Sequence, residues 1–275
     1  MDVGRRGLRY STQPQGFDGL FAGQSDPVQR VKTRRDAFEK ALVFMAALAL
    51  SLLRDRNAGD LPAAAKKVIG KFEGRPISMG GWFELACALA AELPHDAEDP
   101  LTRSVRALVN ADGSRSELAR AIETDIIPDR NEQTHGVQAT EEAVTVHEPE
   151  LKQLWATLEK SVDGLRGARL SSLARLVDHD PAKGTGSYEV RKLHGSPMHF
   201  SLREVTVRGK LDKQWAYVMV VEKALSLAPL VACAADEDGS RHEVYLARSL
   251  SLKGGKPVEV ESISTSGKRK KNPLT

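Results

Sequence analysis

The hydrophobic pattern of this 275-residue chain changes its period once, near residue 168, and this change limits the folds that the chain can adopt. Up to residue 167, apolar residues recur every three or four positions, which is typical of helices packed on a common core. The segments that follow are short, β-branched or alternating, and separated by turn-forming sequences. Helices followed by strands indicate an α+β fold, with an N-terminal all-α helical bundle joined to a small antiparallel β module.

Four parts follow from this pattern. Residues 1–25 are rich in Gly, Gln and Ser, and we expect them to be partly disordered. The helical bundle is predicted over residues 26–167, the β-rich module over residues 168–265 and a basic tail over residues 266–275. We expect the β module to be separable, because the apolar stripe after Pro149 completes the bundle by itself.

Capping residues and prolines mark the predicted helices. Pro27 follows residues suited to an N-cap and opens a helix that continues to about Arg56, the second half of which is apolar nearly all round. Ser78 is the expected N-cap of a further helix, and Ser114 or Ser116 that of another. The most regular stripe comprises Leu151, Leu154, Trp155, Leu158, Val162 and Leu165. The expected strands lie within residues 188–193, 198–202, 215–221, 230–235, 243–247 and 258–264.

Composition indicates a soluble, cytoplasmic protein without a disulfide framework. Cys87 and Cys233 are far apart in apolar surroundings, as expected of reduced core residues. No secretory signal is evident, and the longest apolar run, Ala41–Leu53, is shorter than the ~20 residues that span a bilayer. We therefore expect no membrane association.

Basic residues gather in two clusters, although the net charge of the chain is only +3. Residues 30–35 are expected to form a solvated helix face. In the tail, the sequence Lys268-Arg269-Lys270-Lys271 would add nonspecific attraction for RNA phosphates, and solvation alone is the simpler interpretation.

The sequence TDIIPDRNEQTHG, residues 124–136, passes abruptly from apolar to polar residues. Because Pro128 lacks an N–H, the preceding helix is expected to kink or restart there. In a restarted helix, Asn131 and His135 share one face and Arg130 can reach the same patch. A permanent cation, an orienting amide and a group that titrates near neutrality can together bind a phosphodiester and move a proton on it.

A purely structural interpretation of the same residues stays open. Arg130 can pair with Asp129 or Glu132, and His135 can be an ordinary histidine at a helix end.

The arrangement of Arg130, Asn131 and His135, followed by Gly136, resembles the R-x4-H motif of the HEPN superfamily (higher eukaryote and prokaryote nucleotide-binding domains). A long first helix, an S-x-G-x-W segment at residues 78–82, an amphipathic helix after the motif and a β-rich C-terminal part agree with a large bacterial subtype. The resemblance covers roughly residues 26–166, and Pro128-Asp129 departs from it, because an aliphatic residue and a continuous helix are expected there.

The resemblance implies an all-helical, dimeric, metal-independent endoribonuclease that acts as a toxin or in antiphage defence. Arg130 would hold the scissile phosphate, His135 would carry the proton and Asn131 would orient one of them. A two-fold homodimer would join both motifs in one groove, with Ile126, Ile127, Leu151 and Trp155 as interface candidates. No cofactor or metal is implied.

Other constellations favour structural roles. Asp178, His179, Asp180, His194 and His199 lack metal-ligand spacing and fit polar turns better. Trp215 and Tyr217 alternate on a predicted strand, where core packing is a more common use than base stacking.

A second function remains open at this stage. Some HEPN domains are inactive, and this chain would then be a dimerisation and partner- or nucleic-acid-binding subunit of a defence or regulatory assembly. In either case the β module is a candidate surface for a protein partner or an antitoxin.

Overall fold

The computed structural model describes residues 27–56, 61–73, 75–128, 141–164, 169–193, 202–220, 223–235, 242–250, 257–262 and 269–271. All described helices precede all described strands in the chain, as the change of period predicts. The helices are α2 (Pro27–Arg56), α3 (Ala63–Lys71), α4 (Met79–Ala91), α5 (Pro100–Arg106), α6 (Glu117–Ala121), the π-helix η1 (Ile122–Ile126) and α8 (Glu141–Ser161).

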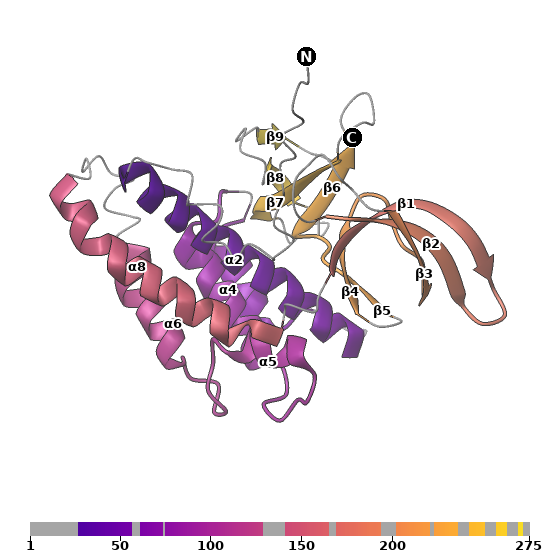
Figure 1. The fold of residues 1–275 in the computed structure, drawn as a ribbon. Coiled ribbons are helices and arrows are strands. Elements are labelled where there is room, and N and C mark those ends of the chain that lie inside the picture. The colour runs from indigo at the N-terminus through magenta and orange to yellow at the C-terminus, as the bar shows by residue number, and fades with distance from the viewer. Residues whose placement is uncertain are drawn as a thin grey trace, which may run out of the picture.

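The strands form two antiparallel sheets rather than one small module. They are β1 (Arg169–Asp180), β2 (Thr185–Lys192), β3 (Leu202–Arg208), β4 (Ala216–Val220), β5 (Lys223–Ser226), β6 (Val231–Ala235), β7 (His242–Leu250), β8 (Pro257–Ser262) and β9 (Arg269–Lys271). The first sheet has the order β3-β2-β1-β4-β5 and the second the order β6-β7-β8-β9. In Figure 1 the helices lie on one side of the molecule, and β1, β2 and β3 project from the other as long, curved strands.

Helix α2 lies at the centre of the helices, as its composition predicts. Its residues from Leu42 to Leu52 are nearly all buried, and it contacts α4, α5 and α8. Arg35, in the basic cluster at residues 30–35, is buried, so it does not belong to the solvated face that we expected.

The predicted helix starts carry the expected caps. The hydroxyl oxygen of Ser78 accepts a hydrogen bond from the Gly81 N–H at 3.2 Å, and that of Ser116 accepts one from the Ala119 N–H at 3.2 Å. Each oxygen satisfies a backbone donor that the first helical turn leaves unpaired. Of the two serines that the sequence offered for the later helix, Ser116 is the cap.

Strand β4 packs against two hydrophobic cores, one on each of its faces. Ala216 and Val218 face the main core together with the helices, whereas Tyr217 and Met219 face a smaller core inside the first sheet. This alternation follows from the two-residue period of a strand, and both faces are apolar because both are covered. Trp215 also contributes to the smaller core, so the packing role predicted for Trp215 and Tyr217 is the observed one.

The continuity of the main core changes the expectation that the β module is separable. Residues from β4, β5, β6 and β7 belong to the same apolar cluster as α2, α4 and α8. The Ile77 N–H donates to the Arg248 carbonyl at 2.7 Å, and the Arg54 guanidinium donates to the Ala228 carbonyl at 2.6 Å. Residue 168 is therefore where helices give way to strands, and the hydrophobic core crosses it.

Three local expectations are corrected. Helix α8 begins at Glu141 and contains Pro149 rather than starting after it, because proline removes a single N–H and packing can hold a helix through it. Strands β1 and β5 were not anticipated, and β3 begins where the predicted strand 198–202 ends. Residues 269–271 form β9 and pair with β8, so this part of the basic tail is a strand.

Candidate functional site

The motif residues Arg130, Asn131 and His135 lie outside the described residues, as do Asp129 and Gly136. The structure does describe both flanks of the motif, which end at Pro128 and begin again at Glu141. We therefore describe the two helical segments on either side of the motif, η1 before it and α8 after it, and call them its supports.

The support before the motif is a widened helical turn. Ile122 and Ile126, at the two ends of η1, are fully buried, and the Ile127 N–H donates to the Ile122 carbonyl five residues earlier. Pro128 follows directly, at the position where the sequence predicts a kink or a restart. A proline interferes with the carbonyl four residues before it, and a π-type turn changes the local spacing of the carbonyls. The helix therefore widens before Pro128.

The support after the motif is helix α8, which packs against α2. Leu151, Trp155 and Leu158 are buried along one face of α8. The Trp155 ring meets the Phe38 ring edge-to-face, with ring centroids 4.9 Å apart and planes at 83°. This geometry is favourable for aromatic pairs, and it fixes α8 to the central helix. In Figure 1 the two helices run side by side.

The S-x-G-x-W segment contacts the end of the first support. A β-carbon placed on Gly80 would lie 3.6 Å from the Ile127 Cγ2 atom, which is ordinary contact. One placed on Gly81 would lie 2.7 Å from the Phe72 ring and 2.8 Å from the Ile77 Cγ2 atom, which is too close. Gly81 therefore permits α4 to pack tightly, and Gly80 places the start of α4 against the residue two positions before Asp129.

The surface of η1 beside the motif is acidic. Glu123 forms a salt bridge with Arg115, whose guanidinium also lies over the Phe83 ring, 5.1 Å from its centroid. The Asp125 carboxylate accepts a hydrogen bond from the Thr124 hydroxyl at 2.7 Å. Carboxylates at this position oppose the approach of a polyanion.

The four residues predicted for a dimer interface are largely unavailable for one. Ile126, Leu151 and Trp155 are buried within the main core of the chain itself, and Ile127 is partly buried against that core. Their helical spacing predicted an apolar stripe correctly, but the stripe packs against this chain's own helices. A homodimer would need a different surface.

The basic residues of the tail are not all in a free segment. Lys268 lies outside the described residues, whereas Arg269, Lys270 and Lys271 form β9. The register sets Glu259 opposite Lys271 and Glu261 opposite Arg269.

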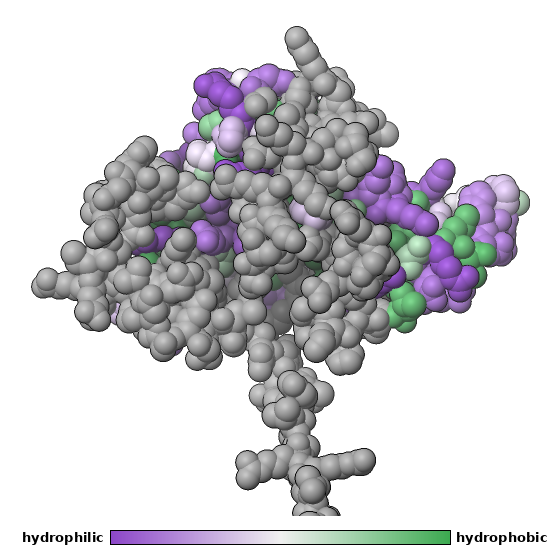
Figure 2. Space-filling model, turned by 90° about the horizontal axis from the view of Figure 1, so that it is seen from above, coloured by the Kyte–Doolittle hydropathy of each residue, from purple (hydrophilic) through white to green (hydrophobic). Residues whose placement is uncertain are grey.

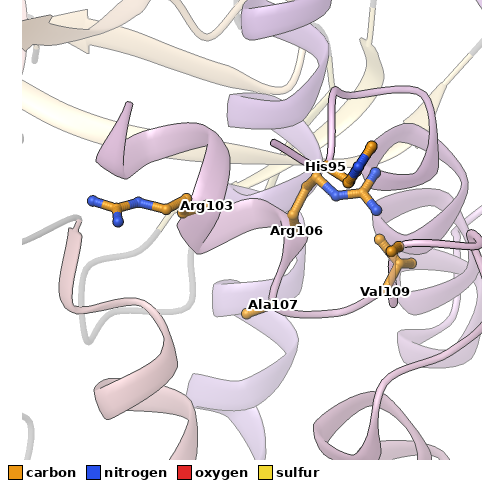
Figure 3. A pocket seen from close by; sticks show the side chains of 6 residues that line it. His95, Arg103, Arg106, Ala107 and Val109 are labelled. Carbon is orange, nitrogen blue, oxygen red and sulfur yellow. The ribbon is translucent and has the colours of Figure 1, made fainter. Parts of the chain in front are cut away.

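A cavity of about 220 Å³ lies between the end of α4 and α5, and it is lined by His95, Arg103, Arg106, Ala107, Val109 and Ala111. In Figure 3 the His95 and Arg106 side chains lie close together, whereas Arg103 points away from them. The Arg106 guanidinium donates to the carbonyls of Ala90, Leu93 and Asn110 at 3.2, 2.5 and 2.6 Å. Arg106 thus caps the C-terminal end of α4, where carbonyls lack helical partners.

The described part of the chain shows neither a reactive cysteine nor a cluster of metal ligands. Burial raises the pKa of the Cys87 thiol and of the Cys233 thiol to about 12, so neither is a thiolate near neutral pH. Among the described residues, no three His, Cys, Asp or Glu side chains gather as metal ligands would. Asp178, His179 and Asp180 lie at the end of β1, where Asp180 accepts hydrogen bonds from the turn that follows, and His194 and His199 lie outside the described residues.

Comparisons with known proteins do not assign this chain to a family. No family model, no curated protein and no solved structure matches it. Within the residues that the structure describes, no helix has both the length and the apolar character needed to cross a membrane.

Proposed function

We propose that this chain is a HEPN-like, metal-independent endoribonuclease that acts as a toxin or an antiphage-defence effector. The observation that carries this proposal is the sequence Arg130-Asn131-Glu132-Gln133-Thr134-His135, which combines a phosphate-binding cation with an acid–base group. The flanks also support it, because η1 before the motif and α8 after it are both tied to one core.

In the proposed reaction, an RNA 2′-hydroxyl attacks the adjacent phosphorus. A neutral His135 accepts the 2′-hydroxyl proton as the new P–O bond forms, and Arg130 stabilises the charge on the non-bridging oxygens. The bond from phosphorus to the 5′-oxygen breaks, and a protonated histidine, from the same or a second copy, donates a proton to that oxygen. The products are a 2′,3′-cyclic phosphate and a 5′-hydroxyl. DNA lacks the nucleophile and is not cleaved.

The test is incubation of a single-stranded RNA with pure protein in EDTA. Wild type should cleave it, and both Arg130→Ala and His135→Ala should reduce the rate at least ~100-fold. Electrostatic stabilisation, lost in the first variant, and general acid–base catalysis, lost in the second, each contribute that much or more. His95→Ala is the matched control, because His95 is an exposed histidine outside the motif. Equal cleavage by wild type and His135→Ala would exclude the catalytic assignment.

The second candidate function is an inactive HEPN-like subunit that dimerises and binds a partner or nucleic acid. The observation that favours it is the acidic surface of η1, where Glu123 and Asp125 precede Asp129 and Glu132. Absence of cleavage by wild type, with self-association retained in light scattering, would support this function over the first.

A further inference from the structure

The strand order of the first sheet allows it to close into a partly open barrel. Strands β3 and β5 are the two edges of the order β3-β2-β1-β4-β5, and they contact each other. Since every pair of neighbouring strands in this order is antiparallel, β3 and β5 run parallel. Five strands in this order, closed between the third and the fifth, form the Greek-key barrel of the OB type, which binds oligonucleotides over its second and third strands and its loops.

Fold alone does not establish binding, so the surface has to supply the chemistry. The turn between β1 and β2 meets the loop after β3, where the Gly209 N–H donates to the Gly184 carbonyl at 3.1 Å. Both glycines have positive φ, +62° at Gly184 and +83° at Gly209, and there is open space where their β-carbons would be. Tyr188 anchors the loop from inside, because its hydroxyl donates to the Gly209 carbonyl at 3.0 Å.

Three exposed cations surround this junction, and we call Lys183, Arg208 and Lys210 the basic corner. Arg208 lies opposite Thr185 in the β2–β3 register, and Lys210 follows Gly209. Within the described residues, neither Arg208 nor Lys210 has a salt bridge. Lys183 pairs with Asp180 at 3.2 Å, and its side chain is 77% exposed.

The carboxylates near the basic corner are already used by the backbone. The Asp180 Oδ1 atom accepts hydrogen bonds from the N–H groups of Ala182 and Lys183 at 3.1 and 3.3 Å. Asp212 likewise accepts one from the Gln214 N–H at 2.9 Å. These hydrogen bonds hold both carboxylates at their turns. Asp180 also pairs with Lys183 through its Oδ2 atom, whereas Arg208 and Lys210 are exposed to solvent.

The distribution of charge along the chain points to the same surface. Residues 26–164 contain 18 Lys and Arg against 23 Asp and Glu, a net charge of −5, whereas residues 165–275 contain 19 against 12, a net charge of +7. The same sheet also exposes apolar side chains, at Leu176 and Val177 of β1, which are 53% and 43% exposed. In Figure 2, hydrophobic and hydrophilic residues alternate over the projecting end of the molecule at the right.

We propose that the barrel formed by β1 to β5 binds single-stranded RNA, with the basic corner holding its phosphates and the apolar residues of β1 contacting its bases. This inference rests on the proposed function for the choice of RNA as the ligand. It assigns attraction of the polyanion to the barrel and cleavage to the motif, whose own surroundings are acidic.

The test uses a fluorescein-labelled 2′-O-methyl oligouridine of 12 nucleotides, which lacks the 2′-hydroxyl nucleophile and cannot be cleaved. Its binding to the full chain is followed by anisotropy over a range of salt concentrations. Lys183→Gln/Arg208→Gln/Lys210→Gln should weaken binding about tenfold or more. It should also reduce the slope of log K against log salt by about 2, since each phosphate contact on a single strand contributes about 0.7.

The matched control removes the same charge from the helices, as Lys67→Gln/Arg103→Gln/Lys160→Gln, at three exposed positions. It should change affinity less than about twofold. No binding by wild type, an unchanged slope in the first variant or equal losses in both variants would overturn the proposal. Cleavage of ordinary RNA is measured separately. If wild type cleaves ordinary RNA and the basic-corner variant binds the oligonucleotide as tightly as wild type, the proposed nuclease stands and this surface is rejected. If binding depends on the basic corner and no cleavage occurs, this surface stands and the proposed nuclease is rejected.

Discussion

At the scale of single residues, two arginines of α5, three positions apart, lie in opposite environments. Arg106 is buried and donates to carbonyls at the end of α4 and in the turn after α5, whereas Arg103 is exposed on the same helix. Hydrogen bonds from a charged donor contribute more than neutral ones, and a buried carbonyl that loses its partner is costly.

We predict that Arg106→Met lowers the free energy of unfolding by about 2 kcal/mol. The Leu93 carbonyl loses its donor, whereas the Ala90 and Asn110 carbonyls keep a backbone donor and lose a second, charged one. Arg103→Met should change the free energy of unfolding by less than ~0.5 kcal/mol, as an exposed substitution does. Urea denaturation of both variants would measure the difference. Similar losses in both would show that the capping bonds of Arg106 are not what stabilises this corner of the bundle.

The two cysteines give a second prediction at this scale. Burial raises the pKa of each thiol from 9.0 to about 12. At pH 8 the thiolate fraction of each cysteine is therefore about a thousandfold lower in the folded chain than in the unfolded chain. Native protein should therefore react with a maleimide far more slowly than urea-unfolded protein. Because the pKa of each thiol is higher in the folded state, the thiols do not change the free energy of unfolding below pH ~9. Between pH ~9 and the folded pKa, each thiol should lower it by about 1.4 kcal/mol per pH unit. Fast labelling of native protein would contradict this burial.

At the scale of elements, the start of α4, beside the support before the motif, depends on close packing as well as on buried apolar area. The start of α4 shows this, because Gly80 and Gly81 are neighbours with different surroundings. Gly81 packs against Phe72 and Ile77 where no β-carbon fits, whereas Gly80 leaves room for one beside Ile127. A methyl group in a packed core typically costs 1–3 kcal/mol, while alanine is the better helix former at an open position.

We predict that Gly81→Ala destabilises the chain by about 1–2 kcal/mol, and that Gly80→Ala is neutral or stabilises it by up to about 0.5 kcal/mol. Thermal unfolding followed by far-UV circular dichroism would compare the two variants. An equally stable Gly81→Ala variant would mean that Phe72 and Ile77 move aside readily, and that the end of α3 is less tightly packed than the structure indicates.

At the scale of the whole molecule, helices and strands depend on each other. Leu225, Leu227, Leu230 and Leu246 lie in the same apolar cluster as α2 and α4. Removing the strands would expose the central helix along the face that meets β5 and β7. Loss of buried apolar area on this scale exceeds what a domain's marginal stability can sustain.

A chain ending at residue 167 should therefore not fold to a native bundle. We expect it to bind ANS and to unfold without cooperativity, whereas the full chain unfolds in one transition. Denaturation monitored by tryptophan fluorescence and ANS binding would distinguish the two states. A cooperative, soluble fragment of this length would restore the original expectation that the β-rich part is separable.

The sequence by itself determined that helices come before strands and where several helices begin, because that information is local. Pro27, Ser78 and Ser116 act on their own helix turns, and the period of apolar residues shows which structure a segment favours. The alternation around Tyr217 likewise predicted packing rather than base stacking.

Only the tertiary structure decided what each apolar face meets and which distant residues come together. Trp155 could have faced a second copy of the chain, and its contact with Phe38 shows that it does not. Gly184 and Gly209 are 25 positions apart, and no periodicity predicts their hydrogen bond. Helix and strand patterns reflect neighbours along the chain, whereas cores, barrels and charged corners depend on the path of the whole chain through space.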